Sequence, residues 1–187
     1  MHAGQNVPLI IRNYEKKDFD ELIDIQAACF PSPFPSSLWW NKEQLHNHVT
    51  LFPEAAICIE INNKVVASLT GVCVDFDLSH PTHTWGEMTA EGYITNHNPY
   101  GNTVYIVDIS VHPLYRNLGL GKLLMHSIYH VVIQKNLERL LGGARMPSYC
   151  QHANQLSADE YLQAIVAGKL HDPVISFLLS CGRVPIK

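Results

Sequence analysis

The chain has few charges and none of the segments that mark membrane or nucleic-acid-binding proteins. Only 16% of its 187 residues are Asp, Glu, Lys or Arg, and the formal net charge is −4. No run of Lys and Arg is present, so the sequence does not predict a nucleic-acid-binding surface. No apolar run has the length of a membrane span, and residues 1–10 lack the charged and apolar regions of a signal peptide. We therefore predict a cytoplasmic protein that binds neither membrane nor nucleic acid.

The cysteines and histidines form no motif that indicates a disulfide framework or a metal site. The five cysteines are odd in number and far apart, and never occur as a C-x-x-C pair, which is typical of reduced, mostly buried thiols. His80, His83 and His97 share one polar segment. An H-x-x-H pair without further ligands and a helix to carry it does not predict a metal. Hydrophobic residues make up 47% of the chain, which is enough for a single domain over residues 1–187.

A strand, a glycine-bearing turn and a helix follow one another between residues 103 and 132. Thr103–Val111 is rich in β-branched residues and alternates, which predicts a strand. One predicted face of this strand carries Val104, Ile106, Asp108 and Ser110. Proline cannot donate to a strand ladder, so His112-Pro113 ends the strand. After RNLGLG at residues 116–121, apolar residues recur every three or four positions, which predicts a helix with one buried face.

This turn has the outline of an anion-binding site. The first backbone amides of a helix have no partner within the helix, and the helix dipole places partial positive charge there. Glycines let a phosphate approach the backbone, and Arg116 and Lys122 add charge. A Walker P-loop needs glycine where Arg116 stands and Ser or Thr where Leu123 stands. A dinucleotide-binding turn needs Gly or Ala at Leu124, so neither pattern fits.

The pattern that fits is V-x-P-x-x-R-x-x-G-x-G, which stands here as Val111-His112-Pro113-Leu114-Tyr115-Arg116-Asn117-Leu118-Gly119-Leu120-Gly121. It resembles the pyrophosphate loop of the GNAT acyl-CoA N-acyltransferases; the alternative is an ordinary strand-to-helix connection with glycines as turn residues. The resemblance implies acetyl-CoA (coenzyme A) as cofactor. It places the pyrophosphate beside Arg116, on the amides of Asn117, Leu118, Gly119, Leu120, Gly121 and Lys122. It places the pantetheine arm along the backbone of Ile109, Ser110 and Val111.

The other segments complete a mixed α/β pattern. Strands are predicted at residues 7–13, 55–61, 65–76, 103–111 and 138–146, and helices at 18–30, 38–49, 120–132, 157–167 and 174–180. This order resembles the GNAT fold, an α/β (α+β) fold with a mixed, mostly antiparallel central sheet and helices on both faces. The resemblance implies that strands 103–111 and 138–146 splay apart at the cofactor. That fold normally ends with two more strands, whereas this chain ends in the first, at residues 183–187.

Acyl transfer to an amine needs a group that takes up the amine proton, and Asp108 is the first candidate. It either accepts the proton, directly or through water, or orients a loop or a substrate cation without proton transfer. Glu91 and His97 lie in the polar segment 77–102, where they are either alternative bases or solvated loop residues.

The acid that would protonate the leaving thiolate is absent from its usual place. The family often has a tyrosine four residues before the glycine that ends the last helix. Counted from Gly182, that position is Leu178. Tyr149 and Tyr161 are substitutes by position, or else core tyrosines.

The leading hypothesis is therefore direct acyl transfer from acetyl-CoA to a primary amine of a small molecule, peptide or protein. The alternative is a non-catalytic CoA-binding module, which the missing tyrosine favours. A homodimer is compatible with the sequence, because a partner's strand would complete the sheet. Residues 143–149, with Tyr161 and residues 168–174 after them, also resemble the acetyltransferase domain that precedes a carbon–nitrogen hydrolase domain in some bacterial proteins.

Overall fold

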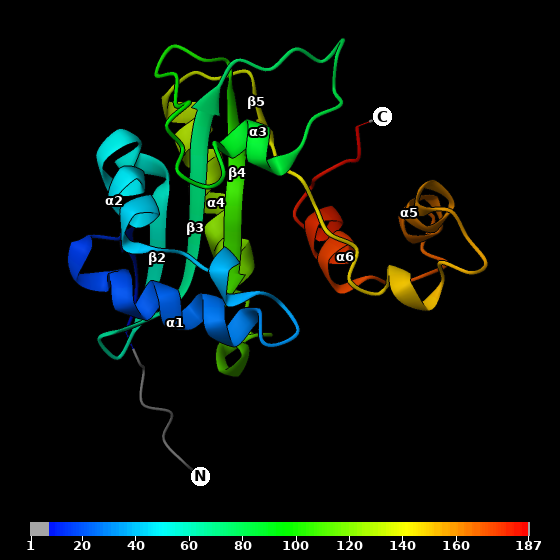
Figure 1. The fold of residues 1–187 in the computed structure, drawn as a ribbon, viewed down its shortest axis with the longest axis horizontal. Coiled ribbons are helices and arrows are strands. Elements are labelled where there is room, and N and C mark those ends of the chain that lie inside the picture. Colours follow the sequence, from blue (N-terminus) through cyan, green and yellow to red (C-terminus); the bar gives the residue numbers. More distant parts are fainter. Residues whose placement is uncertain (1–7, 187) are drawn as a thin grey trace. The chain divides into compact units, whose positions relative to one another are not determined.

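The structure, a computed structural model, describes residues 8–186 and divides into two compact units. The division falls after Gly142. The first unit contains a five-stranded sheet with helices, and the second contains two helices, α5 and α6 (Figure 1).

The sheet of the first unit is mixed and mostly antiparallel, which confirms the predicted fold class. Its strand order is β1-β2-β3-β4-β5, with β1 to β4 antiparallel and β5 parallel to β4. The strands are β1 (Leu9–Asn13), β2 (Ala56–Ile61), β3 (Lys64–Val74), β4 (Thr103–Val111) and β5 (Arg139–Leu141). Every residue of β3 after Lys64 is buried, because this central strand is covered on both faces.

Helices cover both faces of the sheet. They are α1 (Phe19–Cys29), α2 (Lys42–Leu51), α3 (Trp85–Thr89) and α4 (Leu120–Gln134). Figure 1 shows α1 on the near side of the strands and α4 behind them. On the α4 side, a Cβ at Gly71 would lie 3.1 Å from side chains of Ala55 and Val104 and 3.4 Å from Ile128. A glycine in the middle of β3 therefore allows α4 to pack closely against the sheet.

Some predicted boundaries are wrong, for identifiable reasons. The second helix begins at Lys42, not near Leu38. Asn41 and Gln44 form a capping box there, whereas residues 36–38 form a separate 3-10 turn. Residues 91–95 form no strand, because they lie in turns where Glu91 and Ile94 have positive φ. The strand predicted at 138–146 covers only Arg139–Leu141, because glycines 142 and 143 follow and do not favour a strand.

The second unit is built around Asp172. Its helices are α5 (Ala158–Val166) and α6 (Pro173–Ser180), with Tyr161, Ile165 and Ile175 as a small core. The fully buried Asp172 carboxylate caps α6 by accepting from the amides of Val174 and Ile175 at 2.9 and 3.1 Å. A capping box of Ser157 and Glu160 begins α5. Residues 183–186 form no strand, contrary to the prediction, and Lys187 lies outside the described residues.

Candidate functional site

A β-bulge in β4 sets which side chains face which helix. Thr70 of β3 pairs with Asp108, but the next residue, Gly71, pairs with Ile106, so Val107 is an extra residue in β4. Val104 consequently faces α4, whereas Asp108 faces Gln26 of α1. The prediction that Val104 and Asp108 share one face is therefore wrong, because regular alternation does not continue through a bulge.

Within residues 8–186, the part of β4 beyond the bulge has a strand partner on one side only. The ladder with β5 ends at the pair Tyr105–Leu141 among the described residues. The amide of His112 donates to the carbonyl of Val66 in β3 at 2.9 Å. By antiparallel alternation, the backbone groups of Ile109 and Val111 then point away from β3. The strand predicted at 138–146 ends at Leu141, so the splay that the resemblance implies stays a prediction.

The turn before α4 presents backbone amides. Asn117 and Gly119 have φ of 64° and 78°, and α4 begins at Leu120 with Gly119 as its N-cap. No backbone acceptor within residues 8–186 takes the amides of residues 118–122. A Cβ added to Gly119 would meet no atom within 4 Å. The turn therefore combines free helix-end donors with open space, which are the requirements of an anion site.

Arg116 joins this turn to the end of β4. Its Nε donates to the carbonyl of Val111 at 3.2 Å, and the Cys29 thiol donates to the same oxygen at 3.3 Å. Burial raises the pKa of Cys29, which keeps the thiol protonated and able to donate. Arg116 and Lys122 are both exposed, so their charges remain available to a ligand.

Asp108 lies half-buried between β4 and α1. Its Oδ2 accepts from Gln26 Nε2 at 3.0 Å and from Ser110 Oγ at 2.8 Å. Gln26 is itself buried, so these contacts hold the carboxylate in one orientation. No sequence motif points to Gln26, and its one signal is that it is a polar residue on the apolar face of the helix predicted at 18–30.

The segment between β3 and β4 approaches β4 through α3. Trp85, the first residue of α3, donates its indole N–H to the carbonyl of Val107 at 2.9 Å. His83 Nε2 lies 3.2 Å from the hydroxyl of Tyr105. Of the alternative bases, Glu91 is exposed with its carboxylate beside Gly86, and the structure does not bring it to Asp108.

A buried chain of hydrogen bonds links β3 to the same segment. The carbonyl of Gly92 accepts from His48 Nε2 at 2.7 Å, so His48 Nδ1 accepts from the Tyr14 hydroxyl at 3.1 Å. Tyr14 then accepts from Thr70 Oγ1 at 2.7 Å. Every member has its partner only when His48 is neutral. The sequence alone offered no signal for this chain, whose members are far apart along it.

Acidification is expected to destabilise the protein through His48. Burial lowers the pKa of His48 from 6.5 to about 4. The unfolded chain therefore takes up this proton first, and stability is lost as the pH falls from 6.5 toward 4. The expected loss in unfolding free energy is about 1.4 kcal/mol per pH unit. Urea unfolding followed by tryptophan fluorescence measures this loss. Trp40 is a suitable reporter because its ring packs edge-on against His48, with the ring centroids 5.0 Å apart.

A matched pair of variants separates His48 from the other histidines. His48→Gln should remove most of the dependence of the unfolding free energy on pH. His46→Gln changes an exposed residue on the same helix and should leave this slope unchanged. Burial also lowers the pKa of His97, which contributes to the slope that remains. Equal slopes in the wild type and His48→Gln would contradict this assignment.

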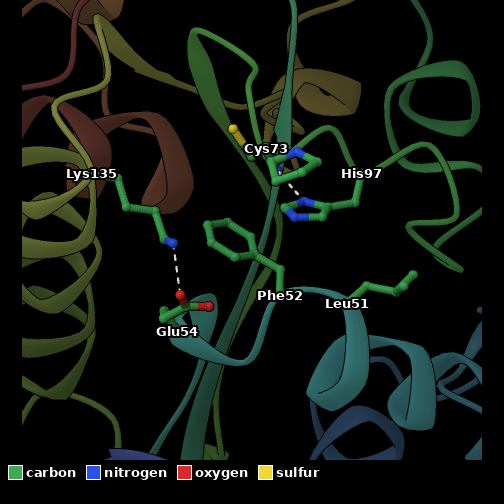
Figure 2. A pocket seen from close by; sticks show the side chains of 7 residues that line it. Leu51, Phe52, Glu54, Cys73, His97 and Lys135 are labelled. Atoms are coloured by element: carbon green, nitrogen blue, oxygen red, sulfur yellow. Dashed lines mark hydrogen bonds and ion pairs between the residues drawn. The ribbon is translucent and has the colours of Figure 1, made fainter.

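A separate recess of about 130 Å³ lies at the other end of α4, and its polar groups are paired with one another. Figure 2 shows Lys135 and Glu54 facing each other, with Nζ and Oε1 2.7 Å apart. His97 stacks on Phe52 at 4.7 Å, and its Nδ1 accepts from the amide of Cys73 at 3.3 Å. Because α4 has 15 residues, about 22 Å of helix separates Lys135 from Gly119. His97 therefore belongs to this recess and not to the surroundings of Asp108.

The two tyrosines predicted as acids lie in the second unit with their hydroxyl groups engaged. Tyr161 is fully buried and donates to Asp172 Oδ2 at 3.2 Å. Burial, together with the Asp172 charge, raises the pKa of Tyr161. Tyr149 donates to the carbonyl of Leu156 at 3.0 Å. Their catalytic roles stay predictions.

Residues 8–186 contain neither a metal-binding cluster nor a membrane-spanning helix. No group of three His, Cys, Asp or Glu side chains is arranged to hold a metal ion among them. None of the described helices combines the length and apolarity needed to cross a bilayer. No disulfide bond joins any of the five cysteines in this part of the chain.

Comparison with known sequences finds a family model and two relatives. The model described as "Acetyltransferase (GNAT) family" matches residues 19–149. The uncharacterized N-acetyltransferase YkwB of Bacillus subtilis (strain 168) is 49% identical over 188 residues, which cover 100% of this chain and 83% of that protein. The probable hydrolase YhcX of the same organism is 37% identical over 174 residues. That match covers 93% of this chain but only 33% of the hydrolase.

Solved structures share the fold at low sequence identity. The loading GNATL domain of CurA from Lyngbya majuscula has a TM-score of 0.79 at 18% identity, covering 96% of this chain and 86% of that chain. The GphF GNAT-like decarboxylase, solved with isobutyryl-CoA, has a TM-score of 0.73 at 22% identity, covering 91% and 84%. At these identities the likeness concerns the fold alone.

Proposed function

The chain belongs to the GNAT family of acetyltransferases, and we propose that it transfers an acetyl group from acetyl-CoA to a primary amine. The observation that carries the proposal is the turn at residues 117–122, whose free amides adjoin the open side of β4. The pyrophosphate binds these amides, with Arg116 and Lys122 adding positive charge. The pantetheine arm follows Ile109, Ser110 and Val111 as an added strand would, using the backbone groups that point away from β3.

The reaction then needs no covalent enzyme intermediate. The amine nitrogen attacks the thioester carbonyl carbon, a C–N bond forms, and the C–S bond breaks to release CoA thiolate. Backbone amides at the opened ladder stabilise the charge that develops on the carbonyl oxygen. Asp108 takes the amine proton, directly or through one water, from the fixed position that Gln26 and Ser110 give it. Because a thiolate is a good leaving group, loss of the usual tyrosine at Leu178 does not prevent turnover.

The acceptor is a small-molecule, peptide or protein amine, and a panel of such amines tests the proposal. The measurement is release of free thiol from acetyl-CoA in the presence of each amine. Turnover with at least one amine above the hydrolysis background is the expected result. Acetyl-CoA binding without turnover on any amine would instead support the non-catalytic module. The engaged hydroxyl groups of Tyr149 and Tyr161 favour that second candidate.

Asp108→Asn is expected to reduce kcat about 100-fold or more, with little change in acetyl-CoA affinity. The amide retains an oxygen for Gln26 but cannot accept the amine proton. Asp24→Asn, at an exposed position of α1, is the control and keeps full activity. A kcat for Asp108→Asn within threefold of wild type would show that Asp108 orients a loop or the substrate without accepting the proton.

The match to the hydrolase supports a narrower proposal. This chain is similar to one third of that protein's length, so we place it in the subgroup of acetyltransferase domains that also occurs joined to hydrolase domains. Action as a single domain, cytoplasmic location and homodimer formation stay predictions.

A further inference from the structure

Trp85 is hydrogen-bonded to the backbone carbonyl of the bulge residue in β4. Its indole Nε1 lies 2.9 Å from the oxygen of Val107, the extra residue of the bulge. Trp85 begins α3, and the capping box of Thr84 and Glu87 holds the start of this helix. Figure 1 shows α3 beside β4. A carbonyl that would otherwise serve a strand ladder thus accepts from a side chain.

The far edge of the same indole is held by tight packing at Gly92. A Cβ on Gly92 would lie 3.1 Å from Cη2 of Trp85 and 2.9 Å from Cζ3 of Trp40. Gly92 has a φ of +81°, so both its conformation and its lack of a side chain suit this contact. The indole is therefore fixed at two points, yet 41% of Trp85 remains exposed. A bulky side chain that is anchored and still exposed on one side is suited to line a binding site.

The position of Val107 decides what this indole would touch. The ladder between β4 and β5 ends at Tyr105, and the proposed pantetheine path begins at Ile109. Val107 lies between these points, at the opened ladder whose amides the proposed function assigns to the thioester oxygen. We propose that Trp85 forms the end wall of the acyl site and restricts the enzyme to short acyl groups such as acetyl and propionyl. This inference rests on the proposed function.

The restriction follows from the anchoring of the ring. Rotation of the indole to admit a longer chain would break its hydrogen bond to Val107 and move it against Gly92. Each methylene that a pocket admits or rejects typically changes discrimination by about 10-fold or more. Wild-type protein should therefore bind hexanoyl-CoA at least about 10-fold more weakly than acetyl-CoA. Trp85→Ala should bring this ratio of dissociation constants close to one.

Calorimetric titration of acetyl-, butyryl- and hexanoyl-CoA into each variant measures the ratio. Trp39→Ala is the matched control. Trp39 also donates its indole N–H to a backbone carbonyl, but this carbonyl belongs to Phe30, at 3.1 Å, and not to β4. We expect it to keep the wild-type ratio. Trp85→Phe, which retains an aromatic ring but not the N–H, should lower the ratio at least threefold. If Trp85→Ala does not fold, Trp85→Phe takes its place in the test.

The outcomes separate this inference from the function on which it rests. Tight binding of acetyl-CoA with the same ratio in wild type and both Trp85 variants would overturn the acyl-length inference and leave the acyltransferase proposal standing. A wild type that binds hexanoyl-CoA as tightly as acetyl-CoA would do the same. Failure of every acyl-CoA to bind the wild type would overturn the proposed function, and this inference with it.

Discussion

Gly119→Glu is expected to weaken acetyl-CoA binding by at least about 100-fold. The new carboxylate would occupy the open space beside the amides of residues 118–122 and repel the pyrophosphate. A hydrogen bond to a charged group is worth roughly 1.5–3 kcal/mol, and each 1.4 kcal/mol is tenfold in affinity. Loss of two such bonds therefore accounts for the effect. Calorimetric titration of acetyl-CoA measures it.

Gly168→Glu is the control for this change. Gly168 has a φ of +70°, close to the +78° of Gly119, and an added Cβ there also meets no atom within 4 Å. Both variants should lose roughly 1 kcal/mol of stability from the left-handed conformation. Only the variant at Gly119 should lose affinity. Equal affinities for the two variants would show that the turn does not hold the ligand.

Arg12→Met is expected to destabilise the protein by about 3–5 kcal/mol, because it leaves a buried carboxylate unpaired. Arg12 donates to both oxygens of Asp18 at 2.7 and 2.9 Å, and Asp18 is only 4% exposed. Although burial alone would raise it, hydrogen bonds from Arg12 and the Glu15 amide hold the pKa of Asp18 below its usual value. Urea unfolding followed by far-UV circular dichroism measures the loss.

The control for this ion pair is Lys42→Met. The Lys42–Asp20 pair is equally short, at 2.7 Å, but both side chains are largely exposed. Its loss should cost less than about 1 kcal/mol. The loss in unfolding free energy caused by Arg12→Met should become smaller at acidic pH. Without Arg12, the buried Asp18 has a raised pKa and becomes protonated. A deficit as small as that of Lys42→Met would contradict a structural role for the buried pair.

The sequence predicted the turn of the site better than its surroundings. Gly119, its neighbours and the helix at Leu120 are local features. A left-handed turn and an apolar helix face each depend on residues that are close together in the sequence. The predicted strand at 103–111 is also confirmed, with the same bounds. A bulge is different, since one added residue leaves the composition of a strand unchanged. The contacts of Val107 with Trp85, and of Asp108 with Gln26, could not be predicted for that reason.

The contacts that sequence reasoning missed join distant segments through single polar atoms. His48 reaches Tyr14 and Gly92, and no periodic pattern connects these three residues. Helix α2 begins later than predicted because the capping box of Asn41 and Gln44 sets its first turn. Side-chain hydrogen bonds of this kind decide boundaries after the hydrophobic pattern has set the element.

Thermal unfolding of the wild type with acetyl-CoA, CoA, ATP or NAD tests the central claim most directly. A ligand that binds only the folded state at 100 times its dissociation constant adds about 2.7 kcal/mol of stability. Acetyl-CoA and CoA should therefore raise the midpoint by several degrees, and ATP and NAD at equal concentration should not. No shift with either CoA species, or a larger shift with ATP or NAD, would contradict the assignment of the turn at residues 117–122 as a CoA pyrophosphate site.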